Sequence, residues 1–295
     1  MPRRDAPVGV FDSGVGGLTI LSELLRELPG ERFVYFGDTG NCPYGVRPQR
    51  EIQELSAAAA RFLLSHGAKI IVVACNTASV SALAFLRANF TNEFVGVVPA
   101  VKPAAARTRS GKVGVAATEA SANGTYLKQL IEQFAHGVEV FAVGCPRLVE
   151  LAEAGKLDGA ETEAAVRGYL APMLAAGIDE LVLGCTHFPA QRAVFARVAG
   201  PGVEILDSGA AIARRTRFVL ERDGLLAGSP DEPGHAPARA PRPLGARDEM
   251  WCSGEDARCE PVAAAILGMP VTVRHAPGML WSERAGQLAA SEQHA

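Results

Sequence analysis

Short aliphatic runs alternate along this chain with longer segments in which apolar residues recur every three or four positions. The short runs have the composition of buried strands. Strands are therefore predicted over residues 8–12, 32–38, 69–75, 94–99, 112–118, 138–145, 180–188 and 203–208. The longer segments predict helices over residues 18–28, 48–65, 79–89, 126–134, 162–176, 191–198 and 210–220. Regular alternation of strands with helices is typical of α/β folds built on parallel sheets, which is the predicted fold class.

The same series of predicted elements occurs twice along the chain. Gly9 and Gly114, each in the first strand of one series, are followed at similar distances by Cys75 and Cys185, each at the end of the equivalent strand. Any two α/β units look alike at this level of detail, so two units without a common origin remain an alternative. The matched cysteines favour a duplication, giving two similar domains related by pseudo-two-fold symmetry.

The composition changes after the last of these helices. Residues 228–248 hold five prolines and no aliphatic period, which predicts a loop or disordered insertion. A helix over 261–267 and a strand over 270–275 are predicted to follow. We expect one domain to comprise residues 1–99 with 208–295, and the other to comprise residues 100–207.

Composition and charge restrict the class of protein. The chain has 295 residues, 48% apolar and 21% charged, with a formal net charge of −3. This is the profile of a soluble globular protein. It lacks the positive field that would attract nucleic acid or an anionic membrane. No segment has the length of a signal-peptide core or of a membrane span, so a cytoplasmic location is expected. The six cysteines form no CxxC pair, which disfavours a zinc site and favours reduced thiols.

Polar side chains gather where the predicted strands end. Ligands of parallel α/β sheets bind outside the carboxyl ends of the strands, so these positions are candidates for a site. They are Asp12, Ser13, Asp38, Cys75, Asn76, Thr77, Thr118, Cys185, Thr186, His187, Asp207 and Ser208. Asp, Asn, Ser and Thr are also the usual helix N-caps, and capping alone would explain Thr118, Asp38 or Ser208. Capping is a poor explanation for the two cysteines.

Cys75 and Cys185 fall at strand-to-helix turns, where a helix N-terminus favours a thiolate. His187 lies two residues beyond Cys185, and Asp12 ends the first strand of the unit that carries Cys75. A cysteine hydrolase, a disulfide switch and a zinc site each use cysteine. None of the three calls for a second thiol at the equivalent place of a duplicated unit. Two thiols on opposite faces of one substrate can invert a stereocentre, because one removes a proton and the other returns one. Cys145 has no adjacent acid–base partner and is taken as structural.

The sequence gives no sign of a cofactor. The stretch DSGVGG after the first strand lacks the full GxGxxG spacing and a Walker lysine, although its amides could hold a carboxylate. None of the five lysines lies at the carboxyl end of a strand, where a pyridoxal phosphate aldimine would be expected. A cofactor-free reaction without a metal is therefore predicted.

Four motifs resemble those of the glutamate racemases in order and spacing. They are VGVFDSGVGGLTIL, YFGDTGNCPYG, VVACNTAS and LVLGCTHFP, the last followed by ILDSG. The resemblance implies two α/β domains with the active site at their interface, and a homodimer. It also implies a cofactor-independent, two-base exchange of L- and D-glutamate that supplies peptidoglycan synthesis. A racemase of the same fold acting on aspartate or another amino acid, and a non-catalytic amino-acid-binding protein, are the alternatives.

The resemblance also implies roles for individual residues. Cys75 would act on D-glutamate with help from Asp12, and Cys185 on L-glutamate with help from His187. Glu153 would be a carboxylate near the second cysteine, with Glu150 as the alternative. The residues that would bind the substrate are Asp12, Ser13, Tyr44, Gly45, Asn76, Thr77, Thr118, Thr186 and His187.

Overall fold

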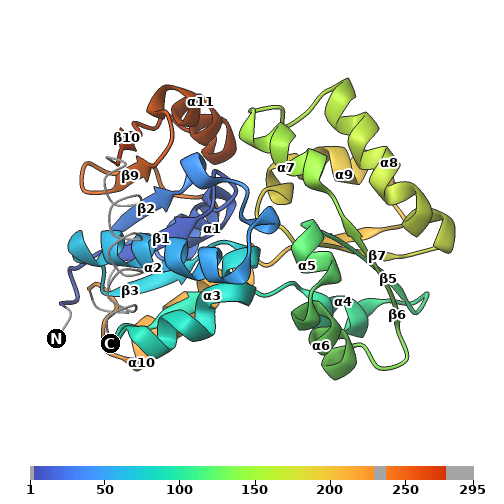
Figure 1. Ribbon diagram of the computed structural model, residues 1–295, viewed down its shortest axis with the longest axis horizontal. Helices are drawn as coiled ribbons and strands as arrows, with labels where there is room; N and C mark the ends of the chain where they lie inside the picture. Colours follow the sequence, from blue (N-terminus) through green and yellow to red (C-terminus); the bar gives the residue numbers. More distant parts are fainter. Residues whose placement is uncertain (1–2, 229–236, 277–295) are drawn as a thin grey trace, which may run out of the picture.

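The computed structural model describes residues 3–228 and 237–276 and consists of two α/β domains side by side (Figure 1). Each domain has one parallel sheet. Sheet A has the order β10-β9-β2-β1-β3-β4, and sheet B the order β6-β5-β7-β8. The strands of sheet A are β1 (Val8–Asp12), β2 (Phe33–Gly37), β3 (Ile70–Val73), β4 (Phe94–Gly96), β9 (Glu249–Cys252) and β10 (Arg274–His275). Those of sheet B are β5 (Lys112–Ala117), β6 (Glu139–Gly144), β7 (Glu180–Leu183) and β8 (Glu204–Leu206).

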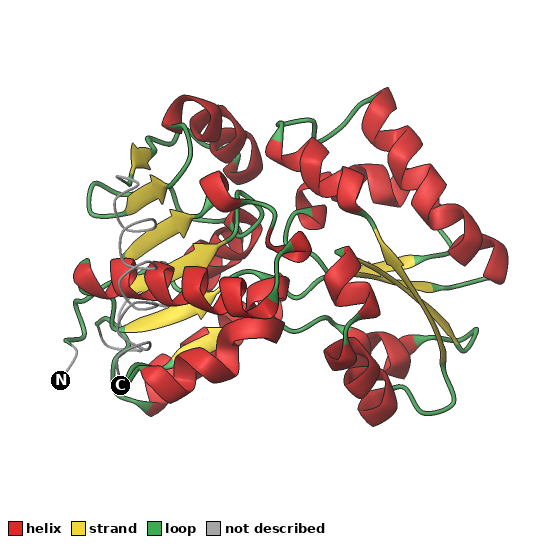
Figure 2. Ribbon diagram, viewed as in Figure 1, coloured by secondary structure: helices red, strands yellow, loops and turns green. Residues whose placement is uncertain are grey.

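Helices cover both faces of sheet A, because alternate strand residues point to opposite faces (Figure 2). In β3, Ile70 and Val72 join the core formed with α1, α10 and α11. Ile71 and Val73 join the core formed with α2 and α3. The helices of this domain are α1 (Leu18–Glu27), α2 (Gln49–Ser65), α3 (Asn76–Asn89), α10 (Gly209–Arg222) and α11 (Asp256–Leu267). The continuously apolar strands are thus those of a sheet buried on both sides.

Sheet B is covered in the same way. Leu181 and Leu183 of β7 contact the core formed with α7, α8 and α9, whereas Val182 contacts the core formed with α4 and α6. The helices of this domain are α4 (Val101–Arg107), α5 (Glu119–Asn123), α6 (Thr125–Phe134), α7 (Pro146–Glu153), α8 (Ala160–Ala176) and α9 (Arg192–Ala199). The order β2-β1-β3-β4 in one sheet equals β6-β5-β7-β8 in the other. The predicted α/β class with two similar parallel-sheet domains is confirmed.

Several predicted elements differ from the observed ones. The strand expected over 180–188 ends at Leu183, because the chain leaves the sheet before Cys185 and turns into a short 3₁₀ helix, η3 (Phe188–Gln191). The strand expected over 270–275 is ordered as a strand only at Arg274–His275. Besides the 3₁₀ helices, three α-helices and one strand of the described residues have no predicted counterpart: α4, α5, α7 and β9. All four are short, so their own periodicity is weak. The domain boundaries at residues 99/100 and 207/208 stay a prediction.

The Pro-rich segment is anchored to sheet A where it is described. Residues 237–248 contain no helix or strand, as predicted, and residues 229–236 lie outside the described part of the chain. Arg242 pairs with the buried carboxylate of Asp248 at 2.6 Å and donates to the carbonyl of Glu31 at 2.7 Å. Asp248 also accepts a hydrogen bond from the amide of Phe33 at 2.9 Å. The segment therefore returns the chain to the edge of β2, where β9 pairs with it.

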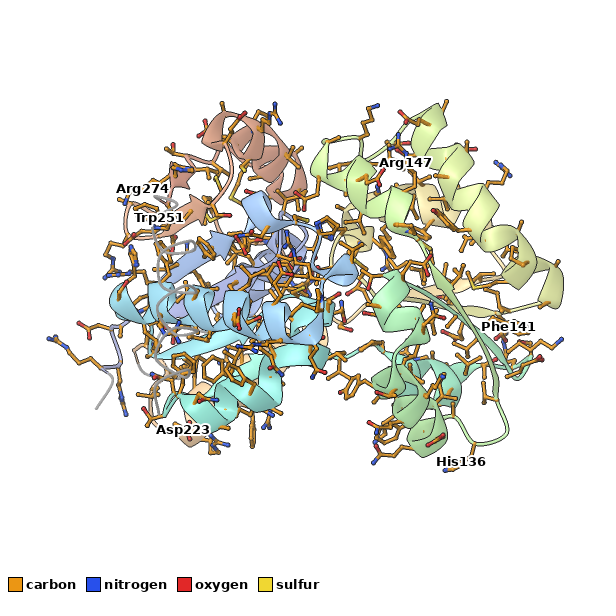
Figure 3. The ribbon with its side chains drawn as sticks, in the orientation of Figure 1. His136, Phe141, Arg147, Asp223, Trp251 and Arg274 are labelled. Atoms are coloured by element: carbon orange, nitrogen blue, oxygen red, sulfur yellow. The ribbon has the colours of Figure 1, made fainter. Side chains whose placement is uncertain are left out.

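The strands that follow extend sheet A past β2. The guanidinium of Arg274 lies over the Trp251 ring, 5.4 Å from its centroid, at the outer edge of the domain (Figure 3). In residues 3–228 and 237–276, no helix has the length and apolar character that crossing a bilayer requires.

Candidate active site

The carboxyl ends of the central strands of the two sheets meet between the domains. The Thr186 hydroxyl, which follows β7, donates to the Asp12 carboxylate at the end of β1 across 3.4 Å. Thr19 donates to the carbonyl oxygen of Thr186 at 2.9 Å. The hydroxyls of Thr77 and Thr118, one from each domain, lie 3.3 Å apart. The two places where parallel sheets bind ligands therefore share one interface.

Cys75 occupies the N-cap of α3 and is 4% exposed. The Ala78 amide donates to its Sγ at 3.4 Å, and the thiol donates to the Ser13 hydroxyl, also at 3.4 Å. Burial raises the pKa of Cys75, and the charge of Asp12 raises it further. The hydrogen bonds to the sulfur lower this pKa, but by less than burial raises it. The thiol form is therefore favoured in the free protein.

Asp12 is fully buried and is held by the turn between β1 and α1. The Ser13 amide donates to one oxygen at 2.7 Å, and the Gly17 amide donates to the other. Burial raises the pKa of this carboxyl, although His187 acts to lower it. A buried acid close to a buried thiol makes the protonation of each depend on the other.

The second thiol, Cys185, lies beside an imidazole–carboxylate pair. Its Sγ is 3.5 Å from Nδ1 of His187, and Nε2 of His187 is 2.5 Å from Glu153. Burial alone would lower the pKa of His187, but hydrogen bonds to Cys185, Cys42 and Glu153 outweigh it and hold that pKa well above its ordinary value. Burial acts to raise the pKa of Glu153, and its bond to His187 overcomes this and lowers it. These contacts therefore favour the imidazolium form of His187 and the carboxylate form of Glu153 next to the thiol.

Glu153, at the last turn of α7, reaches across the interface to the first domain. It accepts from the Val15 amide at 2.8 Å. A Cβ added to Gly14 would stand 1.9 Å from its carboxylate oxygen, so this approach requires glycine. Glu150, the alternative to Glu153 in the sequence, pairs with exposed Arg147 at 2.6 Å. Of the two carboxylates, only Glu153 lies beside His187.

Two 3₁₀ turns, η1 (Thr39–Asn41) and η2 (Tyr44–Val46), form a loop over the site. Tyr44 is buried and donates from its hydroxyl to Asp38 at 2.6 Å. Ser253, from beyond β9, donates to the same carboxylate at 2.6 Å. Burial raises the pKa of Asp38, against these hydrogen bonds. Asp38 thus acts as the anchor of the loop that carries Tyr44 and Gly45.

Thr118 and Asn76 complete the interface. Thr118 caps α5 by accepting from the Ser121 amide at 3.2 Å, so the capping explanation is correct, and its hydroxyl also faces Thr77. Asn76 is 4% exposed, and its side-chain oxygen is buried with no hydrogen-bond partner. A buried acceptor without a partner is costly unless a ligand satisfies it.

A cavity of about 280 Å³ lies between the loop and α7, lined among others by Cys42, Gly45, Thr118, Val149 and Glu153. The two catalytic candidates Cys75 and Cys185 are buried and are not among its lining residues. The cavity therefore adjoins the interface through Thr118 and Glu153 without reaching the thiols.

Cys42 and Ser253 have no predicted role in the sequence. The structure places Cys42 beside His187 and Glu153, and Ser253 against Asp38. Neither contact has a signal in the spacing of the sequence, because each joins segments more than 100 residues apart. The residues to which the resemblance assigns roles all lie along the interface described above: Asp12, Ser13, Tyr44, Gly45, Asn76, Thr77, Thr118, Cys75, Cys185, Thr186, His187 and Glu153.

Comparisons with known proteins agree with this geometry. The chain matches the family described as Asp/Glu/Hydantoin racemase over residues 16–216. It is 51% identical over 223 residues to the glutamate racemase of Herpetosiphon aurantiacus, covering 76% of this chain and 88% of that relative. Among solved structures, it is similar to the RacE1 glutamate racemase of Bacillus anthracis, with a TM-score of 0.78, 31% identity and coverage of 93% and 98% of the two chains. It is equally similar to Escherichia coli glutamate racemase in complex with L-glutamate and the activator UDP-MurNAc-Ala, with a TM-score of 0.77, 33% identity and coverage of 92% and 97%. The chain therefore belongs to the Asp/Glu/Hydantoin racemase family.

Proposed function

We propose that the protein is a glutamate racemase that interconverts L- and D-glutamate without a cofactor, by proton transfer between Cα and two thiols. The observation that carries the proposal is the pair Cys75 and Cys185. These buried thiols follow equivalent strands of two duplicated domains, at the interface where those strands end. The names of the relatives support glutamate as the substrate.

The reaction needs one base and one acid on opposite faces of Cα. In the L-to-D direction, the thiolate of Cys185 takes the Cα proton and the thiol of Cys75 gives its proton to the other face. The Cα–H bond broken on one face is replaced by a Cα–H bond on the other, and the two sulfurs exchange protonation states. The reverse reaction begins with Cys75 as the base. Positioned acid–base groups of this kind contribute about 10²- to 10⁴-fold to a rate.

The neighbours of each thiol have separate tasks in this proposal. The imidazolium of His187, held by Glu153, stabilises the Cys185 thiolate through the 3.5 Å contact. Asp12 raises the pKa of Cys75 and so keeps its proton available for donation. The ammonium group of the substrate would offset the charge of Asp12 when Cys75 acts as the base.

The remaining residues would hold the substrate. The unpartnered oxygen of Asn76 is an acceptor for the substrate ammonium. The donors proposed for the two carboxylates are backbone amides and hydroxyls of Ser13, Tyr44, Gly45, Thr77, Thr118 and Thr186. Neutral donors suit an amino acid with two carboxylates, because they orient it without competing for the Cα proton. The resemblance further supports three proposals: that the product serves peptidoglycan synthesis, that the enzyme acts in the cytoplasm and that it forms a homodimer.

The experiment that tests the proposal is a circular-dichroism assay of the purified protein with L-glutamate, L-aspartate and L-glutamine, with no cofactor added. We expect turnover of L-glutamate and little or none of the other two. In deuterated water, the product enantiomer should carry deuterium at Cα. Turnover that requires added pyridoxal phosphate would contradict the cofactor-free reaction, and faster turnover of aspartate would assign the alternative substrate.

A further inference from the structure

Three side chains at the interface offer metal ligands that the proposed reaction does not use together. One ligand atom each from Cys42, Glu153 and His187 lies within 4.8 Å of the other two. Cys42 comes from the loop of the first domain, whereas Glu153 and His187 come from the second. The three donors are a sulfur, a nitrogen and an oxygen, the set that zinc accepts in proteins.

The distances are close to those of a metal site. Around a tetrahedral zinc ion, with bonds of about 2.0 to 2.3 Å, ligand atoms stand about 3.3 to 3.8 Å apart. The cluster therefore needs shifts of about 1 Å, including an opening of the 2.5 Å contact between His187 and Glu153. Cys42 lies on the loop over the site, so it is the ligand best able to adjust.

We propose that Cys42, His187 and Glu153 form a binding site for a thiophilic divalent cation such as Zn²⁺, with water as the fourth ligand, and that occupation of this site inhibits the enzyme. Binding releases two protons to solvent, one from the Cys42 thiol and one from the imidazolium of His187. Mg²⁺ and Ca²⁺ prefer oxygen ligands and are expected to bind poorly here.

The surroundings hold two of the ligands in place. The Val15 amide donates to Glu153 at 2.8 Å. If His187 binds the ion through Nε2, its Nδ1 keeps its 3.5 Å contact with Cys185. Contacts of this type orient metal ligands and raise their affinity. The ion would also open the contact between His187 and Glu153, which the proposed mechanism uses beside Cys185, and would fix the loop to the second domain. The inhibitory part of the proposal rests on the proposed function.

Binding can be tested without activity by titrating the purified protein with Co²⁺. We expect a thiolate-to-cobalt charge-transfer absorption that saturates at one equivalent and is displaced by Zn²⁺. Cys42→Ala should lose this absorption. Cys145→Ala, a matched control that removes another free cysteine outside the cluster, should keep it. An unchanged absorption in Cys42→Ala would overturn the site, because the ion would then be held by another thiol.

The second part of the test measures inhibition of racemisation by Zn²⁺. Zn²⁺ should inhibit the wild type and Cys145→Ala, with reversal by a chelator and no effect of Mg²⁺. Each variant is compared with its own metal-free rate, and Cys42→Ala should need at least about 10-fold more Zn²⁺ for the same inhibition. Equal inhibition of Cys42→Ala and the wild type by Zn²⁺ would overturn the proposal. If the alanine variant fails to fold, Cys42→Ser is used in its place. If the wild type binds Co²⁺ through Cys42 but racemises nothing, the site stands and the proposed function fails.

Discussion

The two domains repeat one strand order but surround their thiols differently. Cys75 has a buried carboxylate, Asp12, and the amides of a helix N-terminus as neighbours. Cys185 has an imidazolium that is itself held by a carboxylate. The first environment favours a protonated sulfur, whereas the second places a hydrogen-bonded imidazole and carboxylate beside the sulfur. The shared strand order thus places both sulfurs at strand ends, and their different neighbours are the basis on which we propose different acid–base roles for them.

The strongest test of this comparison removes each sulfur in turn. Cys75→Ala and Cys185→Ala should each lower the racemisation rate about 10³-fold or more, because one face of Cα loses its acid–base group. In deuterated water, Cys75→Ala should still exchange the Cα proton of L-glutamate alone, and Cys185→Ala that of D-glutamate alone. Circular dichroism and proton NMR measure the two effects. Racemisation at a rate near that of the wild type in either variant would show that the two-thiol assignment is wrong.

His187→Asn should have the next largest effect, a loss of about 100-fold in kcat/KM. The enantiomers have equal free energies, so kcat/KM must fall equally in both directions. The different roles of the two thiols should appear instead in the primary isotope effect. This effect should rise with Cα-deuterated L-glutamate, because Cys185 is the base that acts on the L enantiomer. His136→Asn is the control, because His136 is exposed on the outer side of the second domain (Figure 3). A larger rise with the D enantiomer would assign His187 to the other thiol.

Asp12→Asn should lower kcat/KM by about 30-fold, a smaller loss because Asn keeps part of the hydrogen bonding. The isotope effect should now rise with D-glutamate. The charge of Asp12 raises the pKa of Cys75, so its removal lowers that pKa and increases the thiolate fraction at a given pH. Alkylation of the Cys75 peptide, followed by mass spectrometry, should therefore begin at lower pH in the variant. An unchanged pH profile would mean that burial alone sets this pKa.

Gly14→Ala tests the contact by which the second domain reaches the first. The new Cβ would occupy the position of the Glu153 carboxylate, which must move away from His187. A displacement of this size should reduce kcat/KM by about tenfold, and Glu153→Gln should give a similar loss. Gly202→Ala is the control, since a Cβ there meets nothing within 4 Å. Full activity in Gly14→Ala would show that Glu153 is not needed to hold His187.

Much of this arrangement could be predicted from the sequence because parallel sheets impose it. Apolar runs such as Ile70–Val73 identify strands buried on both faces, and the residues that follow them must lie at one edge of the sheet. This rule brought together Asp12, Cys75 and His187. The identification of Glu153 depended on the family resemblance, since α7 is only eight residues long and was not predicted.

Contacts between distant segments could not be predicted, because they depend on how the two domains meet. Cys42 approaches Glu153 only because the loop after β2 closes over α7. The strand β9 has four residues and directly follows the Pro-rich segment, so nothing in its own pattern distinguishes it from a continuation of that loop. Its pairing with β2 is what brings Ser253 to Asp38.

The edges of the two sheets are a further difference between the domains. Sheet A extends past β2 into β9 and β10, whereas the described part of sheet B ends at β6. Ser253→Ala removes the hydroxyl that donates to Asp38 and accepts from the Gly40 amide at 3.0 Å. One such hydrogen bond is worth about 1 kcal/mol, so KM for glutamate should rise only about fivefold, with kcat unchanged. Ser65→Ala, which removes a hydroxyl hydrogen bond at the far end of α2, should leave both constants unchanged. A fall in kcat instead would mean that the extension acts on the thiols, and the difference between the domains would then include their chemistry as well as their loops.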